Sequence, residues 1–398
     1  MRALPALRAP LQPPERSMRF AKRITVILVL IGFVVTIVIV LPDEKNPSLA
    51  RKRFARSSPH QQPPPPIILN TTYPHTKPRR LADGERVYRI GIVADLDTDS
   101  AIKSSDGKAP TKWRSYLKRG DLVVAKNRRS AEITWDARRV ELTSSISERG
   151  RGMELSDLTF FNGKLLAVDD RTGIVFYVRG FDRRDVEEIA VVPWTILSDG
   201  PGGIAKGFKG EWMTVHNRHL YVGGLGKVWT TTRGEVRNAH PQWVKKVGPL
   251  GGVRHLNWID NYNALHSAIG IEHPGYVIHE AACWSDVHRR WFFLPRRASR
   301  ESYDDQEDER RATNLLISCD ERFRDVTYRR IGALNPTVGF SSFKFVPGTG
   351  DSIILAVKSE EDRGHIESYV TVFSVDGDIL MEPTLIGDRT KYEGIEFL

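Results

Sequence analysis

Five short apolar segments of this chain each open with an acidic or hydroxyl residue and continue through a turn into a second apolar run. The openers lie 55, 69, 61 and 52 residues apart, and they are Ser156, Glu211, Glu280, Ser341 and Glu393. If a repeated fold makes these positions equivalent, three carboxylates and two hydroxyls face one another around one axis. Carboxylates at such range repel strongly, so a cation is their natural partner, and an all-oxygen ligand set favours Ca²⁺ over Zn²⁺. The alternative is that each opener is an ordinary strand-end residue that faces water.

A second group of charged residues follows apolar runs of the chain and would lie near the mouth of the same axis. Its members are Asp95, Asp97, Asp169, Asp170, Arg171, Arg296, Arg297 and Lys358. Arginine binds phosphate oxygens in a bidentate manner, whereas carboxylates hold a metal ion or orient water. The group therefore favours a phosphate ester or anhydride as substrate. A network of salt bridges between loops explains each of these residues equally well when it is taken singly.

Short strands would position these residues. Apolar runs such as residues 89–94 and 353–357 are bounded by turn residues, and no long segment shows an apolar period of 3.6 residues. The repeat is slightly longer than a propeller blade of about 40–50 residues, so five openers predict five blades. The last opener, Glu393, lies in the final strand, and the first β segment, residues 88–95, has no opener before it. We therefore predict an all-β, five-bladed β-propeller over residues 87–398, closed by pairing of its N-terminal and C-terminal strands.

The net charge of +10 is confined to one end of the chain. Residues 1–80 hold fourteen Lys and Arg and three Asp and Glu, which leaves 45 basic and 46 acidic residues in the remaining 318. A nearly neutral domain lacks the large basic footprint of a nucleic-acid binder. The two cysteines, Cys283 and Cys319, are too few for a disulfide scaffold or a structural zinc site, and their spacing does not decide whether they pair.

The N-terminal part of the chain predicts a membrane anchor. Residues 24–41 are eighteen residues without a charge, which just spans a bilayer. Asn70-Thr71-Thr72 is an N-glycosylation sequon, usable only in the lumen. We expect a cytosolic tail (1–23), a transmembrane signal anchor (24–41) and a disordered luminal stalk (42–86), and hence a single-pass type II membrane glycoprotein of the Golgi or ER. Cleavage at the basic stretch 51–53 would release a secreted soluble form.

Several longer motifs carry more specific information. Residues 150–157 read Gly-Arg-Gly-Met-Glu-Leu-Ser-Asp, residues 168–173 read Val-Asp-Asp-Arg-Thr-Gly, and residues 391–397 read Lys-Tyr-Glu-Gly-Ile-Glu-Phe. From about residue 87 to the end, the chain resembles the calcium-activated nucleotidase (apyrase) family, and its anchor makes it more similar to the vertebrate-type members. The resemblance implies Ca²⁺ on the propeller axis and hydrolysis of nucleoside diphosphates, UDP and GDP more than ADP, and of some triphosphates. Such an activity would support glycosylation and proteoglycan synthesis by removing diphosphates that inhibit glycosyltransferases.

Residues matched to the family's motifs receive roles from the resemblance. The implied metal positions are Ser156, Asp157, Glu211, Glu280, Ser341 and Glu393. Asp97 and Trp113 match nucleotide-site positions, and we add Asp95 and Arg297 as substrate-binding residues. As catalytic residues we predict Asp97 or Asp170, which would orient or deprotonate water, and Arg151 and Arg296, which would stabilise the phosphoryl charge. The family also suggests a homodimer favoured by Ca²⁺.

Two other functions are consistent with the same predicted fold. In the first, the propeller is a non-catalytic binding module stabilised by Ca²⁺. In the second, it is a Ca²⁺-dependent lactonase or esterase. The sequence leaves open the base preference, the oligomeric state, the cleavage of the stalk and the identity of the general base.

Overall fold

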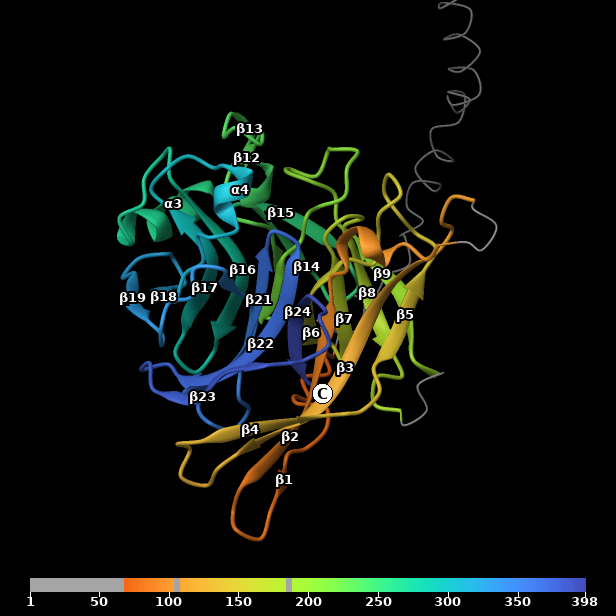
Figure 1. Ribbon diagram of the computed structural model, residues 1–398, viewed down its shortest axis with the longest axis vertical. Coiled ribbons are helices and arrows are strands. Elements are labelled where there is room, and N and C mark those ends of the chain that lie inside the picture. Colours follow the sequence, from red (N-terminus) through yellow and green to blue (C-terminus); the bar gives the residue numbers. More distant parts are fainter. Residues whose placement is uncertain (1–67, 104–107, 184–187) are drawn as a thin grey trace, which may run out of the picture. The chain divides into compact units, whose positions relative to one another are not determined.

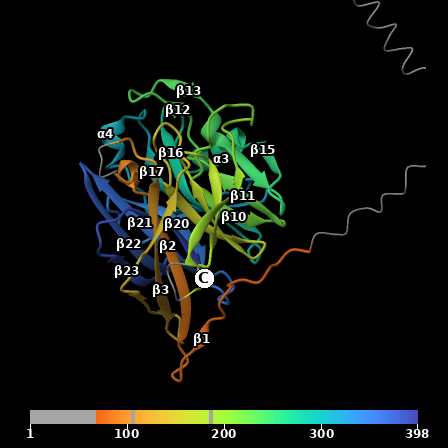
Figure 2. The same ribbon diagram turned by 90° about the vertical axis from the view of Figure 1, so that its right-hand side faces the viewer.

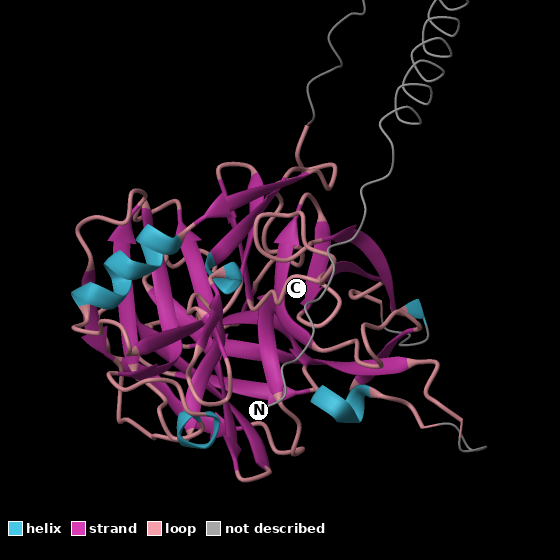
Figure 3. Ribbon diagram, turned by 90° about the horizontal axis from the view of Figure 1, so that it is seen from above, coloured by secondary structure: helices cyan, strands magenta, loops and turns pink. Residues whose placement is uncertain are grey.

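The computed structural model describes residues 68–103, 108–183 and 188–398, and these residues form a five-bladed β-propeller, as the repeat predicts. Strands make up most of the fold, and the helices are few and short (Figures 1 and 3). Each blade is a sheet of antiparallel strands, and the first blade holds six strands where the other four hold four.

The strands of the first blade come from both ends of the described chain. They are β1 (Arg79–Arg80), β2 (Arg86–Ala94), β3 (Trp113–Val124), β4 (Ala131–Trp135), β5 (Val140–Ser144) and β24 (Tyr392–Phe397). The second blade contains β6 (Leu155–Phe161), β7 (Lys164–Asp169), β8 (Ile174–Arg179) and β9 (Ala190–Ile196). The third blade contains β10 (Trp212–His216), β11 (His219–Gly223), β14 (Trp243–Val247) and β15 (Val253–Asn257).

The last two blades follow the same order from the centre outwards. The fourth contains β16 (Tyr276–Ser285), β17 (Arg290–Ser299), β18 (Leu315–Asp320) and β19 (Thr327–Arg330). The fifth contains β20 (Val338–Phe345), β21 (Ile353–Asp362), β22 (His365–Ser374) and β23 (Ile379–Leu385). The remaining elements are the hairpin β12 (Trp229–Thr230) and β13 (Val236–Asn238), the helices α3 (Ile259–Ala268) and α4 (Asp305–Asp308), and the 3₁₀ turns η1 (Asp97–Ser100) and η3 (His240–Gln242).

The innermost strands β24, β6, β10, β16 and β20 contact one another in a closed circle. The first blade closes this circle because β24 pairs antiparallel with β2, with Ile92 opposite Ile395 and Ile90 opposite Phe397. The expected pairing of the two ends is therefore present. Closure satisfies the backbone groups of both strands and leaves neither as a free edge.

Apolar side chains fill the spaces between neighbouring blades. Ile90 and Ile92 of β2 pack with Leu355 and Val357 of β21 and with Ile395 of β24, and all five are buried. Between the third and fourth blades the core is aromatic, and its members include Trp212, Trp258, Trp291, Phe293 and Phe323. Since each blade buries both of its faces, the strands read as continuous apolar runs as well as alternating ones.

The first described residues lie on the propeller. The backbone N–H of Asn70 donates to Asn162 Oδ1 at 3.0 Å, and the hydroxyl of Tyr73 donates to Glu396 Oε1 at 2.7 Å. Residues 68–86, which we assigned to the stalk, thus join the propeller: their first residues lie against the second blade and β24, and β1 and the start of β2 belong to the first blade. The predicted anchor at residues 24–41 lies outside the described residues, and no helix within the described ranges is long and apolar enough to cross a membrane.

Ring closure generates a prediction about stability. Ile395→Ala removes a fully buried side chain from β24 and should lower the free energy of unfolding by about 2–5 kcal/mol, measured by urea titration. Ile196→Ala is the matched control, because Ile196 on the outer strand β9 is 66% exposed, and its effect should be small. Equal losses for the two variants would contradict the assignment of β24 as the closing strand.

Candidate active site

A cavity of about 520 Å³ lies where the innermost strands begin, at the end of the ring that carries β12 and α4 (Figures 1 and 2). Its lining includes ten acidic and seven basic residues. The acidic ones are Asp95, Asp97, Asp170, Glu211, Glu280, Asp305, Asp308, Glu309, Glu361 and Glu393, and the basic ones are Arg151, Arg171, Lys209, Lys227, Arg296, Arg297 and Lys391. The excess of carboxylates makes the cavity a potential site for a cation.

Four of the five openers sit where the pairing of an innermost strand is interrupted. The register shifts around Ser156 in β6, around Glu280 in β16, around Ser341 in β20 and around Glu393 in β24. A β-bulge leaves such a residue unpaired and re-aims its side chain. The fifth opener, Glu211, precedes β10, and its N–H donates to the carbonyl of Gly223 at 2.8 Å. Four of the five blades thus present their opener at an interruption of the pairing between strands.

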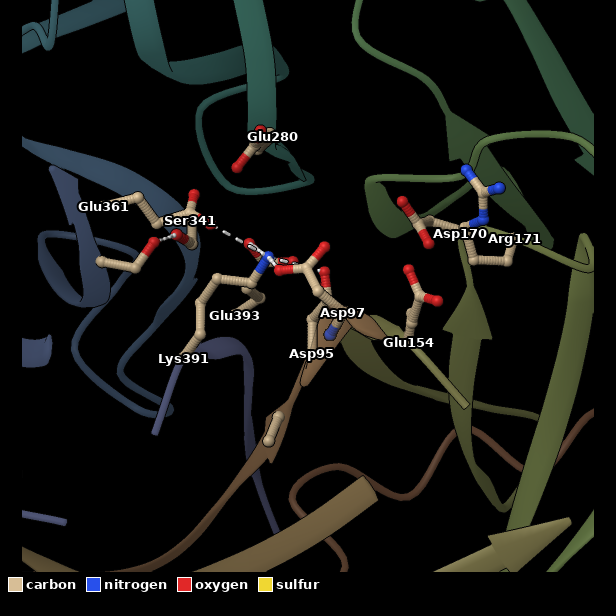
Figure 4. Close-up of polar contacts among 12 residues, drawn as sticks. Asp95, Asp97, Glu154, Asp170, Arg171, Glu280, Ser341, Glu361, Lys391 and Glu393 are labelled. Atoms are coloured by element: carbon tan, nitrogen blue, oxygen red, sulfur yellow. Dashed lines mark hydrogen bonds and ion pairs between the residues drawn. The ribbon is translucent and has the colours of Figure 1, made fainter. Parts of the chain in front are cut away.

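Arg296 joins openers from three blades. Its Nη1 donates to Glu280 Oε2 at 2.5 Å, to Ser341 Oγ at 3.1 Å and to Glu393 Oε1 at 3.0 Å. Its Nη2 donates to Glu361 Oε2. Figure 4 shows Glu280, Ser341 and Glu393 approaching one another from separate strands. Three predicted metal positions therefore converge, and the guanidinium of Arg296 lies among them rather than at the cavity mouth.

A lysine accompanies each of two opener glutamates at a spacing of two residues. Lys209 Nζ lies 2.8 Å from Glu211 Oε1 and also pairs with Asp170. Lys391 Nζ lies 3.7 Å from Glu393 Oε1 and pairs with Asp95 at 2.8 Å. Residues i and i+2 of an extended chain share a face, so the Lys-x-Glu spacing was the signal that could have identified both lysines in advance.

A third cluster of acids borders the openers. Carboxylate oxygens of Asp95, Glu154 and Asp170 all lie within 4.8 Å of one another, and all three residues are buried. Arg151 binds Glu154 through Nε at 2.8 Å, and its Nη2 donates to Asp97 Oδ1 at 3.0 Å. Glu154 and Glu361 did not figure among the predicted site residues. Glu154 lies inside the motif 150–157, two residues before Ser156, and that proximity was the available signal.

Burial and charge act in opposite directions on these carboxyl groups. Burial raises the pKa of Glu154 to about 8, against the effect of Arg151. Burial also raises the pKa of Glu211 to about 8, with Lys209 opposing and Glu280 adding to the shift. In Glu361 the effect of burial is outweighed by Lys391 and Arg296, which lower its pKa to about 2. Carboxyl groups that would otherwise take up protons are suited to a bound cation, which supplies the missing positive charge.

The residues at the centre fit Ca²⁺. The donors are carboxylate and hydroxyl oxygens, which is the set that Ca²⁺ prefers. Ser156 Oγ is buried and has no hydrogen-bond partner among the described residues. A cation would satisfy this unpaired oxygen by accepting its lone pair, and the excess of acids around the cavity also favours a cation.

The carboxylate of Asp157 is directed elsewhere. It accepts hydrogen bonds from Met213 N at 2.7 Å, Ser342 Oγ at 2.7 Å and Lys344 Nζ at 3.1 Å. All of these are buried contacts between blades, and Asp157 does not line the cavity. The backbone of Asp157 also lies so close to Gly394 that a Cβ there would approach its Cα to 2.7 Å. Only glycine allows β6 and β24 to come this near to each other.

The other predicted residues divide into those at the cavity and those away from it. Asp95, Asp97, Asp170, Arg171, Arg151 and Arg297 line it. Trp113 does not, because its ring is buried and its Nε1 donates to the carbonyl of Gly150 at 2.9 Å. Asp169 and Lys358 also lie away from the cavity lining. Asp169 accepts hydrogen bonds from the backbone N–H groups of Met153 and Arg171, and Lys358 Nζ lies 4.8 Å from the centre of the Phe340 ring.

Comparisons with known proteins agree with the geometry. The apyrase family model matches residues 97–398. The chain is 54% identical over 329 residues to soluble calcium-activated nucleotidase 1 of Rattus norvegicus, which covers 83% of this chain and 78% of that protein. It is 45% identical over 322 residues to apyrase apy-1 of Caenorhabditis elegans, which covers 80% of this chain and 86% of that protein. A solved α-L-arabinanase of Penicillium chrysogenum aligns with 73% of this chain and 98% of its own at a TM-score of 0.33 and 8% identity, too low to carry an argument.

The contacts of Asp157 predict a structural effect for its removal. Asp157→Ala leaves Lys344 buried without a counter-ion, which should lower the free energy of unfolding by about 3–5 kcal/mol in urea, with or without Ca²⁺. Asp325→Ala is the control, since Asp325 also pairs with a basic residue, Arg290, but its side chain is 72% exposed. A loss of stability seen only when Ca²⁺ is present would instead make Asp157 a metal ligand.

Proposed function

The chain belongs to the apyrase family, and from that premise we propose that it is a calcium-activated nucleotidase whose active centre is the central cavity. It hydrolyses nucleoside diphosphates, UDP and GDP more readily than ADP, and some triphosphates, to the monophosphate and inorganic phosphate. The observation that carries the proposal is the convergence of Glu211, Glu280 and Glu393 from three blades on one acid-rich cavity. The two alternative functions, a non-catalytic binding module and a Ca²⁺-dependent lactonase or esterase, are distinguished from this activity by the tests below.

The openers of the innermost strands would hold the metal ion. These are Ser156, Glu211, Glu280, Ser341 and Glu393, with Arg296 and the two lysines adjusting their charge. When bound, Ca²⁺ supplies positive charge that polarises the phosphate oxygens. Asp157 belongs to the metal set by family resemblance alone, because its carboxylate serves the contact between blades.

Residues of the chain itself would then position the nucleotide and the attacking water. Arg151 and Arg297 line the cavity and can hold the phosphate oxygens through paired N–H groups. Asp170 Oδ1 has no hydrogen-bond partner among the described residues, so it can accept the proton of the attacking water. The water oxygen bonds to the terminal phosphorus, the bond to the bridging oxygen breaks, and the nucleoside monophosphate leaves.

Asp97 and Arg296 would act mainly on their neighbours. Both oxygens of Asp97 are engaged, one by Arg151 at 3.0 Å and the other by Lys391 at 2.6 Å. Asp97 therefore fixes the orientation of Arg151 at the mouth of the cavity. Arg296 is surrounded by Glu280, Glu361 and Glu393, so we assign it to stabilising the acid cluster more than to direct phosphate binding.

We also infer that the protein resides in the secretory pathway. The support is the uncharged segment 24–41 and the sequon at Asn70, whose side chain is exposed on the propeller surface. Such a protein would be a type II membrane protein with its cavity in the lumen of the Golgi or ER, and the family resemblance favours a Ca²⁺-dependent homodimer. A mobility shift on glycosidase treatment of the expressed protein, lost in Asn70→Gln, would test the topology.

Metal dependence provides the first test of the activity. Phosphate release from UDP by the full chain should fall to background with EGTA and return with Ca²⁺, because the metal neutralises the carboxylates and the substrate. Glu280→Gln and Glu393→Gln should each raise the Ca²⁺ concentration for half-activation at least about tenfold, since each removes one charged ligand. Glu301→Gln, on an exposed side chain, is the matched control. Equal rates with Ca²⁺ and with chelator would overturn the mechanism.

A second test separates an enzyme from a binding module. Asp97→Ala should lower kcat on UDP by about 10²-fold or more, because Arg151 loses one of the two carboxylates that orient it and keeps only Glu154. The melting temperature should change little, since the Asp97 side chain is 43% exposed. Unchanged turnover of UDP, or turnover of a lactone in its place, would count against the assignment.

A further inference from the structure

A second cavity, of about 550 Å³, lies at the other end of the first blade. Its lining comes from β2, β3, Asp136 after β4, residues 181–183 after β8, the segment 76–79 that leads into β1, and Leu398 after β24. It shares no residue with the central cavity. Arg89 lies in this second cavity and Asp95 in the first, and six residues of extended chain separate them by about 20 Å. Figures 1 and 2 show β1 at the end of the ring opposite to β12 and β13.

The charge balance of this cavity is the reverse of that at the centre. Its lining contains three acidic residues, Asp121, Asp136 and Asp182, and five basic ones, Lys77, Arg79, Arg89, Arg119 and Arg183. In a domain that is nearly neutral, such a local excess of positive charge needs an explanation. Either the cations fasten neighbouring segments together, or they receive an anion.

The carboxylates of the cavity are already engaged. Asp136 accepts from both terminal nitrogens of Arg89, through Oδ1 at 2.9 Å and through Oδ2. Asp121 bridges Arg89 at 3.3 Å and Arg79 at 3.4 Å. Asp182 lies 3.6 Å from His75 Nε2. The aspartates therefore fix the planes of Arg89 and Arg79. Arg183 pairs with Glu188 at 3.6 Å, and Leu398, whose terminal carboxylate carries a negative charge, also lines the cavity.

Arg119 is a buried cation without an adequate counter-ion. The residue is only 9% exposed, and its Nη1 donates to the backbone carbonyls of Phe181 at 3.1 Å and Arg183 at 2.7 Å. Its Nε has no hydrogen-bond partner among the described residues, and the oxygen of Asp136 is 3.8 Å away. Burial, and then the charge of Arg89, lower the pKa of Arg119. A fixed guanidinium in this state is stabilised by an anion that completes its hydrogen bonds.

Lys77 adds a second uncompensated charge at the rim. Its side chain is exposed, and no hydrogen bond or ion pair within the described ranges engages it. Val87 and Phe181 supply apolar wall next to these cations. An apolar wall beside a fork of N–H donors suits an oxyanion attached to an organic group better than a bare ion.

We propose that this cavity is a second ligand site, which binds a phosphate or sulfate ester through Arg119 and Lys77, with Arg89 held beside them by Asp136. The charge of the Arg119 guanidinium would attract one oxygen of a tetrahedral anion, because its Nη1 is already engaged by the carbonyls of Phe181 and Arg183, and the ammonium group at the rim would meet another oxygen. The site is independent of the proposed hydrolysis, because it lies at the other end of the ring and contains none of the acids of the central cavity.

Binding of small anions to the full chain in EGTA tests the proposal. Sodium sulfate, phenyl sulfate and phenyl phosphate are titrated against sodium chloride of equal ionic strength, and the melting temperature and the heat of binding are recorded. We expect saturable binding, tighter for the phenyl esters than for sulfate, and weakened at least about tenfold in Arg119→Gln and about threefold in Lys77→Gln. Arg171→Gln, in the central cavity, should leave the titration unchanged.

Two outcomes would overturn the proposal. One is a response to sulfate and the esters no larger than the response to chloride, which would leave the cations with a purely structural role. The other is loss of binding in Arg171→Gln with retention in Lys77→Gln, which would place the anion in the central cavity. Lys77→Gln is the decisive variant if Arg119→Gln does not fold, because Lys77 is exposed. Its hydrolysis of UDP should equal that of the parent protein, so failure here is distinguishable from failure of the nucleotidase assignment.

Discussion

The repulsion among carboxylates buried around one axis is the constraint on which the centre of this propeller depends. Glu280 and Glu393 come from two blades and share the guanidinium of Arg296. Glu211 comes from a third blade, pairs with Lys209 and feels the charge of Glu280. Buried charges of one sign are tolerated only when cations and hydrogen bonds compensate them. Arg296, Lys209 and Lys391 meet part of this need, and the remaining excess of acid suits a divalent cation. The ring gathers these carboxylates at its centre, and the calcium requirement follows from that arrangement.

Closure of the ring and assembly of the site are coupled through the first blade. The strand β24 completes the sheet against β2, and it also carries Glu393, with Lys391 just before it. Asp95 directly follows the strand β2, and Lys391 contacts it at 2.8 Å. A change that weakens the pairing of these strands would therefore disturb both the stability of the propeller and the charge balance of the cavity.

The two cavities near opposite ends of β2 show how an almost neutral domain can present opposite local charge. At one end of β2 the acids outnumber the bases, and at the other end the bases outnumber the acids. A nucleotide would thus be held by a few arginines near a metal site rather than by the overall charge of the protein. The proposed ester site relies on the same principle, because a buried cation such as Arg119 attracts an anion more strongly than a solvated cation does.

The repeat pattern of the sequence was enough to predict the architecture and to locate the openers. The length of the repeat reflects a sheet of four strands, the number of openers gave the number of blades, and the unmatched first and last strands implied closure. The structure separates the neighbours Ser156 and Asp157 at the bulge of β6, because Ser156 Oγ is buried without a hydrogen-bond partner among the described residues, whereas Asp157 meets Lys344 of another blade. The positions of Arg296 among the acids and of Arg119 without a counter-ion were likewise invisible in the chain. Alternation and turns are local properties that a sequence displays, whereas the pairing of charges depends on distances across the ring, which exist only once the blades have packed.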